Sequence, residues 1–169
     1  AEYQVMAIDK TGISSFFILP LFINERKNIS RYELENIVQK SGLTYKGFSG
    51  DGFVEINTKE NRTINFPVAV TVPGVYAIYF RYANGNGPVN TENKCAIRTL
   101  QVDQKFTGTV VFPQRGKEEW SNWGISNAVQ ATLSKGKHVI TLSFTDANDN
   151  MNESVNEAML DYMELVRIQ

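Results

Sequence analysis

The sequence predicts an all-β protein built as a sandwich of two sheets, and three observations lead to this prediction. In residues 76–83, Tyr76, Ile78, Phe80 and Tyr82 fall on one side of an extended chain, and this period of two in aromatic and β-branched residues is typical of a strand. Comparable segments recur at short intervals, with turn residues between them. The chain of 169 residues is long enough for one domain with a sizeable core.

The composition disfavours two classes of partner. Lys and Arg number 17 and Asp and Glu number 18, a formal net charge of -1, so neither nucleic acid nor an anionic membrane is expected as the main partner. No apolar run reaches the roughly 18 residues of a membrane span. No leader peptide is recognisable, so the chain is expected to be cytosolic or a part of a longer protein. The single Cys95 excludes an internal disulfide and is expected to be a small buried residue.

The first 28 residues are expected to form a unit of their own ahead of a main domain at residues 29–169. Residues 3–8 predict a strand, 9–12 a turn and 13–23 a second extended segment. Their pattern, Y-x-V-x-A-x-D-x-x-G-x-x-S, resembles the end of a fibronectin type III or related immunoglobulin-like domain. Because two strands cannot form such a domain alone, we expect either the remainder of a preceding domain or a hairpin packed on the main sandwich.

The start of the main domain fits two structures. Ser30 and Glu33 suit a capping box, and the apolar spacing that follows, up to Gly42, suits a short helix. In a strand, Glu33 and Glu35 would share one face, whereas a helix would separate them by about 200°.

The remaining strands and turns follow from alternation and from turn residues. Strands are expected at residues 53–56, 66–72, 76–83, 98–103, 109–112, 128–133, 139–144 and 159–168. Turns or loops are expected at residues 47–52, 57–62, 84–87, 134–137 and 148–156. Pro67 lacks an amide hydrogen for strand pairing, so its segment is expected at a sheet edge or at the start of a strand.

The sequence contains no recognisable catalytic motif. The single histidine, His138, begins a predicted strand and is expected to be a structural residue. No Gly-x-Ser-x-Gly elbow, phosphate-binding loop or metal-binding histidine pair is present. Glu118 and Glu119 are adjacent and fit a solvated turn. The chain is therefore expected not to be an enzyme.

A series of motifs in a fixed order resembles the carbohydrate-binding modules of families 6 and 35. The motifs are YELE at 32–35, GFSGDGFV at 47–54, FRYANGNG at 80–87, Arg98, Phe112-Pro113, Trp120 with Trp123, and LDYMEL at 160–165. The resemblance runs from about residue 29 to the end of the chain and implies a jelly-roll sandwich of the galactose-binding-like type. It also implies a strand over residues 32–36 and makes residues 88–97 an insertion.

Three carboxylates form a candidate metal site. Glu33 and Glu35 on one strand face, with Asp161 on a last strand expected beside the first, would repel one another unless a cation lay between them. In the modules that this chain resembles, the matching residues hold a structural calcium ion. The other interpretation is that all three are exposed strand carboxylates.

A sugar site is expected at the loops. Sugars stack their C–H faces on aromatic rings and need amide, carboxylate or guanidinium partners for their hydroxyls. Trp120 is the expected stacking platform and Tyr45 a second wall, while one of Trp120 and Trp123 is expected in the core. The further candidates for this site are Trp123, Asn84, Asn86, Arg81 and Arg98.

Two positions depart from the family pattern. Met159 stands where modules of this kind often carry an Asn, and Phe48 replaces a Tyr. Asn150, Asn152 and Asn156, in the loop before the last strand, are candidate substitutes for the missing amide.

The sequence therefore predicts a carbohydrate-binding accessory module of a larger glycan-degrading enzyme that is secreted, periplasmic or at the cell surface. Its expected partners are a poly- or oligosaccharide and the neighbouring domains of the parent enzyme, with calcium as a structural ion. The alternative is an interdomain β-sandwich without affinity for sugar.

Overall fold

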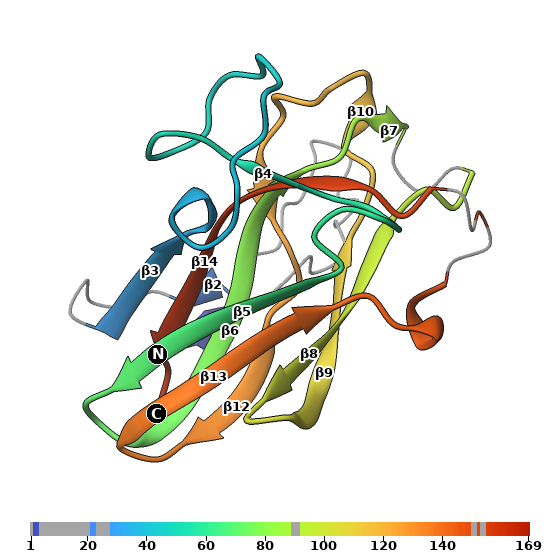
Figure 1. The fold of residues 1–169 in the computed structure, drawn as a ribbon. Coiled ribbons are helices and arrows are strands. Elements are labelled where there is room, and N and C mark those ends of the chain that lie inside the picture. The colour runs from blue at the N-terminus through green and yellow to red at the C-terminus, as the bar shows by residue number, and fades with distance from the viewer. Residues whose placement is uncertain (1, 4–20, 23–27, 89–91, 150–151, 153–154) are drawn as a thin grey trace, which may run out of the picture.

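A computed structural model describes residues 2–3, 21–22, 28–88, 92–149, 152 and 155–169. Its strands form two antiparallel sheets that pack face to face (Figure 1), so the predicted all-β sandwich is confirmed. Among the described residues, no helix has the length and hydropathy to cross a membrane.

The first sheet is organised around the two longest strands. β6 (Gly74–Ala83) pairs with β14 (Ala158–Arg167), which pairs in turn with β3 (Ile29–Glu33) and β4 (Val54–Ile56). On its other side β6 pairs with β11 (Gly124–Ile125) and β12 (Val129–Leu133).

The second sheet has the order β5-β13-β8-β9. Its strands are β5 (Thr63–Val70), β13 (Gly136–Ser143), β8 (Ala96–Val102) and β9 (Lys105–Phe112). Residues of β5 alternate strictly between exposed and buried, because one face of this sheet packs on the core and the other meets water. Pro67 lies in β5, which is an edge strand as expected.

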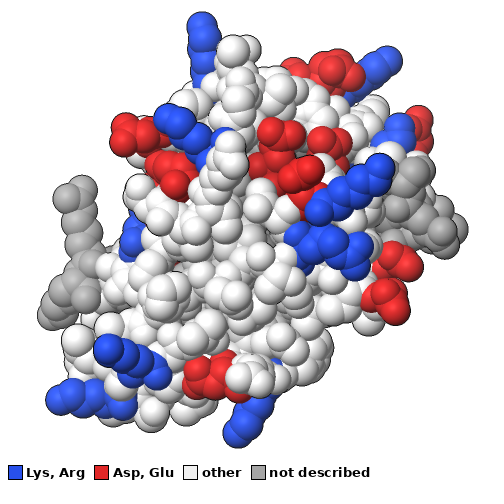
Figure 2. Space-filling model, in the orientation of Figure 1, with Lys and Arg blue, Asp and Glu red and all other residues white. Residues whose placement is uncertain are grey.

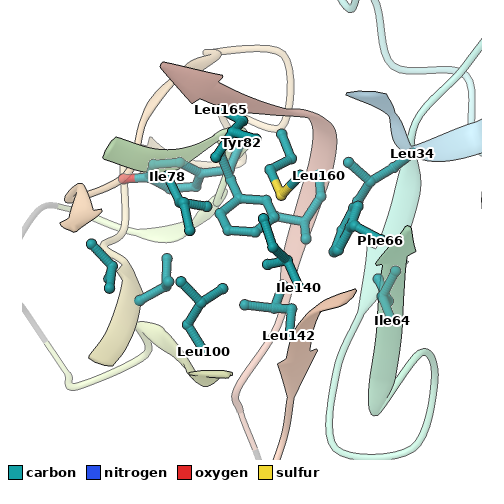
Figure 3. Packing of buried hydrophobic residues seen from close by; sticks show 14 of the residues in the cluster. Leu34, Ile64, Phe66, Ile78, Tyr82, Leu100, Ile140, Leu142, Leu160 and Leu165 are labelled. Carbon is teal, nitrogen blue, oxygen red and sulfur yellow. The ribbon is translucent and has the colours of Figure 1, made fainter. Parts of the chain in front are cut away.

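The core fills the space between the sheets. Phe66 from β5, Phe80 from β6 and Phe112 from β9 are fully buried, with ring centroids 5.8 and 6.0 Å apart along the series. Figure 3 shows aliphatic side chains of both sheets in this core, among them Leu100 and Ile140 of the second sheet. Burial of this apolar surface is the main stabilising contribution to the fold.

The chain after β3 differs from both interpretations of the sequence. The strand ends at Glu33, and Leu34–Asn36 forms a single 3-10 turn. The amides of Ile37 and Val38 donate to the Leu34 carbonyl at 2.9 and 3.0 Å. Leu34 is fully buried in the main core, so the turn places its side chain between the sheets.

Other predicted boundaries were also shifted. β9 begins at Lys105 and not near residue 109, and β5 ends at Val70. Cys95 is half-buried and not fully buried as expected. A 3-10 turn at Asp146–Asn148 precedes the predicted polar loop.

Short strand pairs lie outside the two main sheets. β7 (Asn86–Gly87) pairs with β10 (Gly116–Lys117) at the upper end of the molecule in Figure 1. β1 (Glu2–Tyr3) pairs with β2 (Leu21–Phe22). Most other residues of the predicted N-terminal unit, 1–28, lie outside the described residues, as do residues 89–91 of the predicted insertion, 88–97. Both expectations therefore stay predictions.

Candidate functional site

A second apolar cluster lies at the loop end of the sandwich, apart from the main core. Phe53, Ala83 and Met159 are buried at its centre, and four aromatic side chains pack against them. These partly buried rings are those of Tyr45, Phe48, Trp120 and Trp123, and with Phe53 they are called the aromatic loop cluster below. The loops therefore bring together three of the predicted ligand-binding residues.

Trp120 and Tyr45 form the outer pair of the aromatic loop cluster. Their ring planes are nearly parallel, at 13°, with centroids 5.9 Å apart. Gly85 supports the Trp120 ring from below, since a Cβ at this position would lie 2.7 Å from the ring carbons. Backbone thus covers one side of a half-buried indole.

Trp123 and Trp120 are both half-buried, so the expectation that one of them lies in the core is wrong. The Trp123 indole nitrogen donates to the Lys46 carbonyl at 2.7 Å, and its ring meets the edge of Phe53 at a centroid distance of 5.6 Å. The Lys46 amide donates in turn to the Ser121 hydroxyl at 3.0 Å. These bonds join the loop that carries Tyr45 to the loop that carries the tryptophans, so Trp123 fixes the position of the pair.

Arg81 connects the aromatic loop cluster to the predicted metal site. Its guanidinium lies 5.5 Å from the centre of the Trp123 ring, pairs with Asp161 and donates to the Gly47 carbonyl at 2.9 Å. The positive charge of Arg81 is thereby held against a buried carboxylate.

Two of the predicted ligand-binding residues are fully buried and engage the protein itself. The Asn84 amide donates to the carbonyls of Lys94 and Phe112 at 3.1 and 3.0 Å. Arg98 donates to the carbonyls of Asn57 and Asn156, both at 3.1 Å, and to the Asn156 side chain.

Burial lowers the pKa of Arg98 to about 10, which leaves it charged at neutral pH. Asn152, another predicted polar residue, donates to the carbonyl of Glu92, within the predicted insertion, at 3.4 Å. None of the described hydrogen bonds of Asn84, Arg98 and Asn152 joins these residues to the aromatic loop cluster.

Sequence reasoning missed three carboxylates near Tyr45 as site residues, whereas Asn86 was among the predicted candidates. Glu157, Glu118 and Glu55 add to the effect of burial in raising the pKa of the Tyr45 hydroxyl. Asn86 donates to the Glu157 carbonyl at 3.4 Å. The sequence pattern that could have revealed Glu55 is its position between the apolar Val54 and Ile56. Because these two neighbours are buried, Glu55 lies on the opposite face of β4.

The three predicted metal ligands converge on one loop. The Ser49 hydroxyl donates to Glu33 at 2.7 Å and to Asp161 at 3.1 Å, and the Ser49 amide donates to both oxygens of Asp161 at 3.0 and 3.1 Å. The Asp51 amide donates to Glu35 at 2.8 Å. Burial raises the pKa of Glu33, and the negative charges of Asp161 and Glu35 add to this shift.

The fit of this donor set to a calcium ion is mixed. In favour of an ion, Glu35 Oε2 is buried without a hydrogen-bond partner, and calcium takes carboxylate oxygens of this kind. Against a formed site, Arg81 already faces Asp161. Within the part of the chain that is described, no three His, Cys, Asp or Glu side chains are arranged so that they could hold a metal ion.

Solved structures of similar shape agree with the architecture. A native family 35 carbohydrate-binding module from Clostridium thermocellum superposes with a TM-score of 0.61 at 22% identity, over 82% of this chain and 98% of the module. The chain has the fold of the family 35 carbohydrate-binding modules. The resemblance noted in the sequence is confirmed at the level of the fold. No protein-family model matches the sequence.

Larger enzymes contain segments similar to this chain. Two cycloisomaltooligosaccharide glucanotransferases of Niallia circulans are 34% and 30% identical over 137 and 135 residues, which make up 79% and 78% of this chain. The matches span only 12% and 13% of those enzymes. A Paenibacillus sp. enzyme of the same name, solved with cycloisomaltoheptaose, superposes with a TM-score of 0.63 at 28% identity over 84% of this chain and 19% of its own.

Proposed function

We propose that this chain is a carbohydrate-binding accessory module of a larger, secreted enzyme that acts on glucans, and that the chain itself is not catalytic. The observation that carries the proposal is the nearly parallel Tyr45–Trp120 pair, which lies half-buried at the loop end. Aromatic faces of this kind suit the C–H faces of sugar rings. Asn86, Glu55 and Glu157 are the nearby groups that would accept or donate hydrogen bonds to sugar hydroxyls.

The relatives suggest the class of sugar. The enzymes similar to this chain are glucanotransferases named for cycloisomaltooligosaccharides, and an isomalto-dextranase structure with panose also shares the fold at a TM-score of 0.61. We therefore take the ligand to be a neutral isomalto-type glucan. The carboxylates around Tyr45 favour a neutral sugar over a uronic acid, because like charges repel in a partly buried site.

The test is a calorimetric titration of the chain with cycloisomaltoheptaose and with panose. Replacement of Trp120 by Ala should abolish binding at the loop end and so sharply reduce the heat of binding, because one aromatic ring dominates the affinity of a small site. The matched control is Ile125→Ala, which removes a side chain that is 43% exposed from the neighbouring β11. A folded wild-type chain that binds neither sugar at millimolar concentration would favour an interdomain structural role.

We further propose a structural calcium ion held by Glu33, Glu35 and Asp161. The unpartnered Glu35 oxygen and the convergence on the Ser49 loop support the proposal. Because Arg81 faces Asp161, ion binding would require this guanidinium to move aside.

Removal of the ion should lower the melting temperature, since an ion that binds only the folded state adds about 2.7 kcal/mol at 100 times its Kd. Glu35→Gln should make the melting curve insensitive to a chelator, whereas the exposed Glu60→Gln should not. Equal melting curves of calcium-loaded and verified metal-free samples would contradict the proposed calcium site.

A further inference from the structure

An open pocket lies at the end of the sandwich opposite the aromatic loop cluster. Its volume is about 680 Å³, and it is bordered by the β8–β9 hairpin, β12 and the start of β13. In Figure 1 these segments meet at the lower end of the molecule, whereas β7 and β10 lie at its upper end. None of the predicted site residues lines this pocket.

A β-bulge presents an aromatic ring at the pocket. The pairing of β8 with β9 shifts after Leu100, which faces Gly108, so that Gln101 faces Phe106 and Thr107 is the extra residue. Such bulges redirect side chains and are common beside binding sites. Phe106 is 69% exposed, the largest exposure among the large hydrophobic residues described. An exposed ring on a wall of a pocket is a candidate contact surface.

The hairpin that carries Phe106 is held in a conformation that is unfavourable for its residues. Asp103 and Gln104 have φ angles of +49° and +67°, which non-glycine residues adopt rarely. The Asp103 amide donates to the Val139 carbonyl, and its carboxylate accepts from the Val139 amide, both at 2.9 Å. His138 adds a contact of 2.7 Å to the same carboxylate. The wall is therefore fixed before any ligand arrives.

β12 forms another border of the pocket. Its residues alternate, with Gln130 and Thr132 exposed and Ala131 and Leu133 buried, so an amide and a hydroxyl face outward along the pocket margin. β9 approaches this strand closely, because a Cβ at Gly108 would lie 2.7 Å from a methyl group of Val129.

The chemistry of the lining suits a sugar ring better than an apolar or protein partner. One exposed ring lies among the Gln130 amide, the hydroxyls of Thr107 and Thr132, and Lys105. An aromatic face with amide and hydroxyl groups is the combination that binds C–H faces together with hydroxyls. The volume falls in the usual range for small-molecule sites, about 300–1,000 Å³. A stable protein interface needs a surface of about 800 Å² from each partner, which a single ring in a concave pocket does not offer.

We propose that this pocket is a second binding site for a neutral glucan, with Phe106 as the stacking face and Gln130 and Thr132 as hydrogen-bond partners. The site goes beyond the proposed function, because it shares no residue with the aromatic loop cluster. A chain with a site at each end would hold two segments of glucan at once. Linked binding of this kind raises affinity for a polymer on the order of 10²-fold or more over either site alone.

The test is a titration of the isotope-labelled 169-residue chain with panose and with cycloisomaltoheptaose, followed by amide chemical shifts. In the Trp120→Ala variant, we expect saturable shifts at Phe106, Gln130 and Thr132. Phe106→Ala should remove the shifts at the pocket. When Trp120 is intact, this variant should keep the shifts at the loop end. Phe106→Tyr should retain both sets of shifts. The control Val72→Ala alters an exposed residue outside the pocket, 48% exposed, and should change neither set.

The possible outcomes separate the two proposals. Shifts confined to the loop end would overturn the second site and leave the proposed function intact. Shifts confined to the pocket would support the second site and contradict the role of Trp120. An absence of shifts at both ends would overturn both, and the exposed Phe106 would then fit contact with a neighbouring domain. Retention of Phe106→Ala on immobilised dextran should fall well below that of the wild type.

Discussion

Fully buried polar side chains connect the loops of this molecule to its sheets. Arg98 is the clearest case, since its guanidinium supplies hydrogens to backbone carbonyls at Asn57 and Asn156 that belong to two different loops. The residue type alone suggested a contact with ligand. The partners that assign Arg98 to the interior are 41 and 58 residues away, so no local pattern could reveal them.

Arg98→Met should destabilise the fold without a direct effect on sugar affinity. Loss of the guanidinium leaves several buried acceptors without donors, and each such group costs about 1–3 kcal/mol. We expect a lower urea midpoint, with a free energy of unfolding reduced by about 2–4 kcal/mol. Lys135→Met, in an exposed turn, is the control. An unchanged urea midpoint for Arg98→Met would show that the buried guanidinium is dispensable.

His138 should make stability depend on pH. Its two ring nitrogens face the Asp103 carboxylate at 2.7 Å and the Ser134 carbonyl at 2.9 Å, so both donate when the ring is protonated. The hydrogen bond with Asp103 is the main cause that raises the pKa of His138. Since the folded pKa lies above the unfolded value of about 6.5, this stabilisation is complete below that pH and is lost as pH rises through the folded pKa.

Melting temperatures of the wild type and of His138→Gln, measured from pH 5.5 to 8.5, test this assignment. The wild type should lose more stability than the variant as the pH rises above about 6.5. Parallel curves for the two proteins would show that His138 does not bind its proton more tightly in the folded state.

At the scale of elements, the strands with clear alternation were predicted and the irregular connections were not. β5 and β6 follow the period of two because one face of each packs on the core. The 3-10 turn at Leu34–Asn36 depends on burial of Leu34 against distant strands, which overrides local propensity. The aromatic loop cluster was predicted in part, since its rings were visible in the sequence but their mutual packing was not.

The loop at Gly85 tests whether backbone support of the Trp120 ring matters for binding. A Cβ at Gly85 would lie 2.7 Å from that ring, so Gly85→Ala should displace the indole and weaken binding of cycloisomaltoheptaose at least tenfold, about 1.4 kcal/mol. Gly42→Ala is a matched control, because nothing lies within 4 Å of its added Cβ. Equal affinities of both variants and the wild type would contradict the role given to this support.

At the scale of the whole molecule, the sandwich separates two kinds of surface. The sheets bury a continuous core and the loop end carries the aromatic loop cluster, while Figure 2 shows Lys and Arg interspersed with Asp and Glu on the face in view. This mixture matches the net charge of -1 and gives no steering toward a highly charged polymer. A neutral glucan is consistent with such a surface.

The central claim is that sugar stacks on Trp120, and the indole N–H signals test it most directly. The chain has two tryptophans, so a labelled sample gives two such signals, and Trp120→Phe identifies which one belongs to Trp120. On titration with cycloisomaltoheptaose, the Trp120 signal should show a large saturable shift. The Trp123 signal should move little, because its N–H is already bonded to the Lys46 carbonyl at 2.7 Å. A stationary Trp120 signal at a sugar concentration that saturates the chain by calorimetry would contradict the claim.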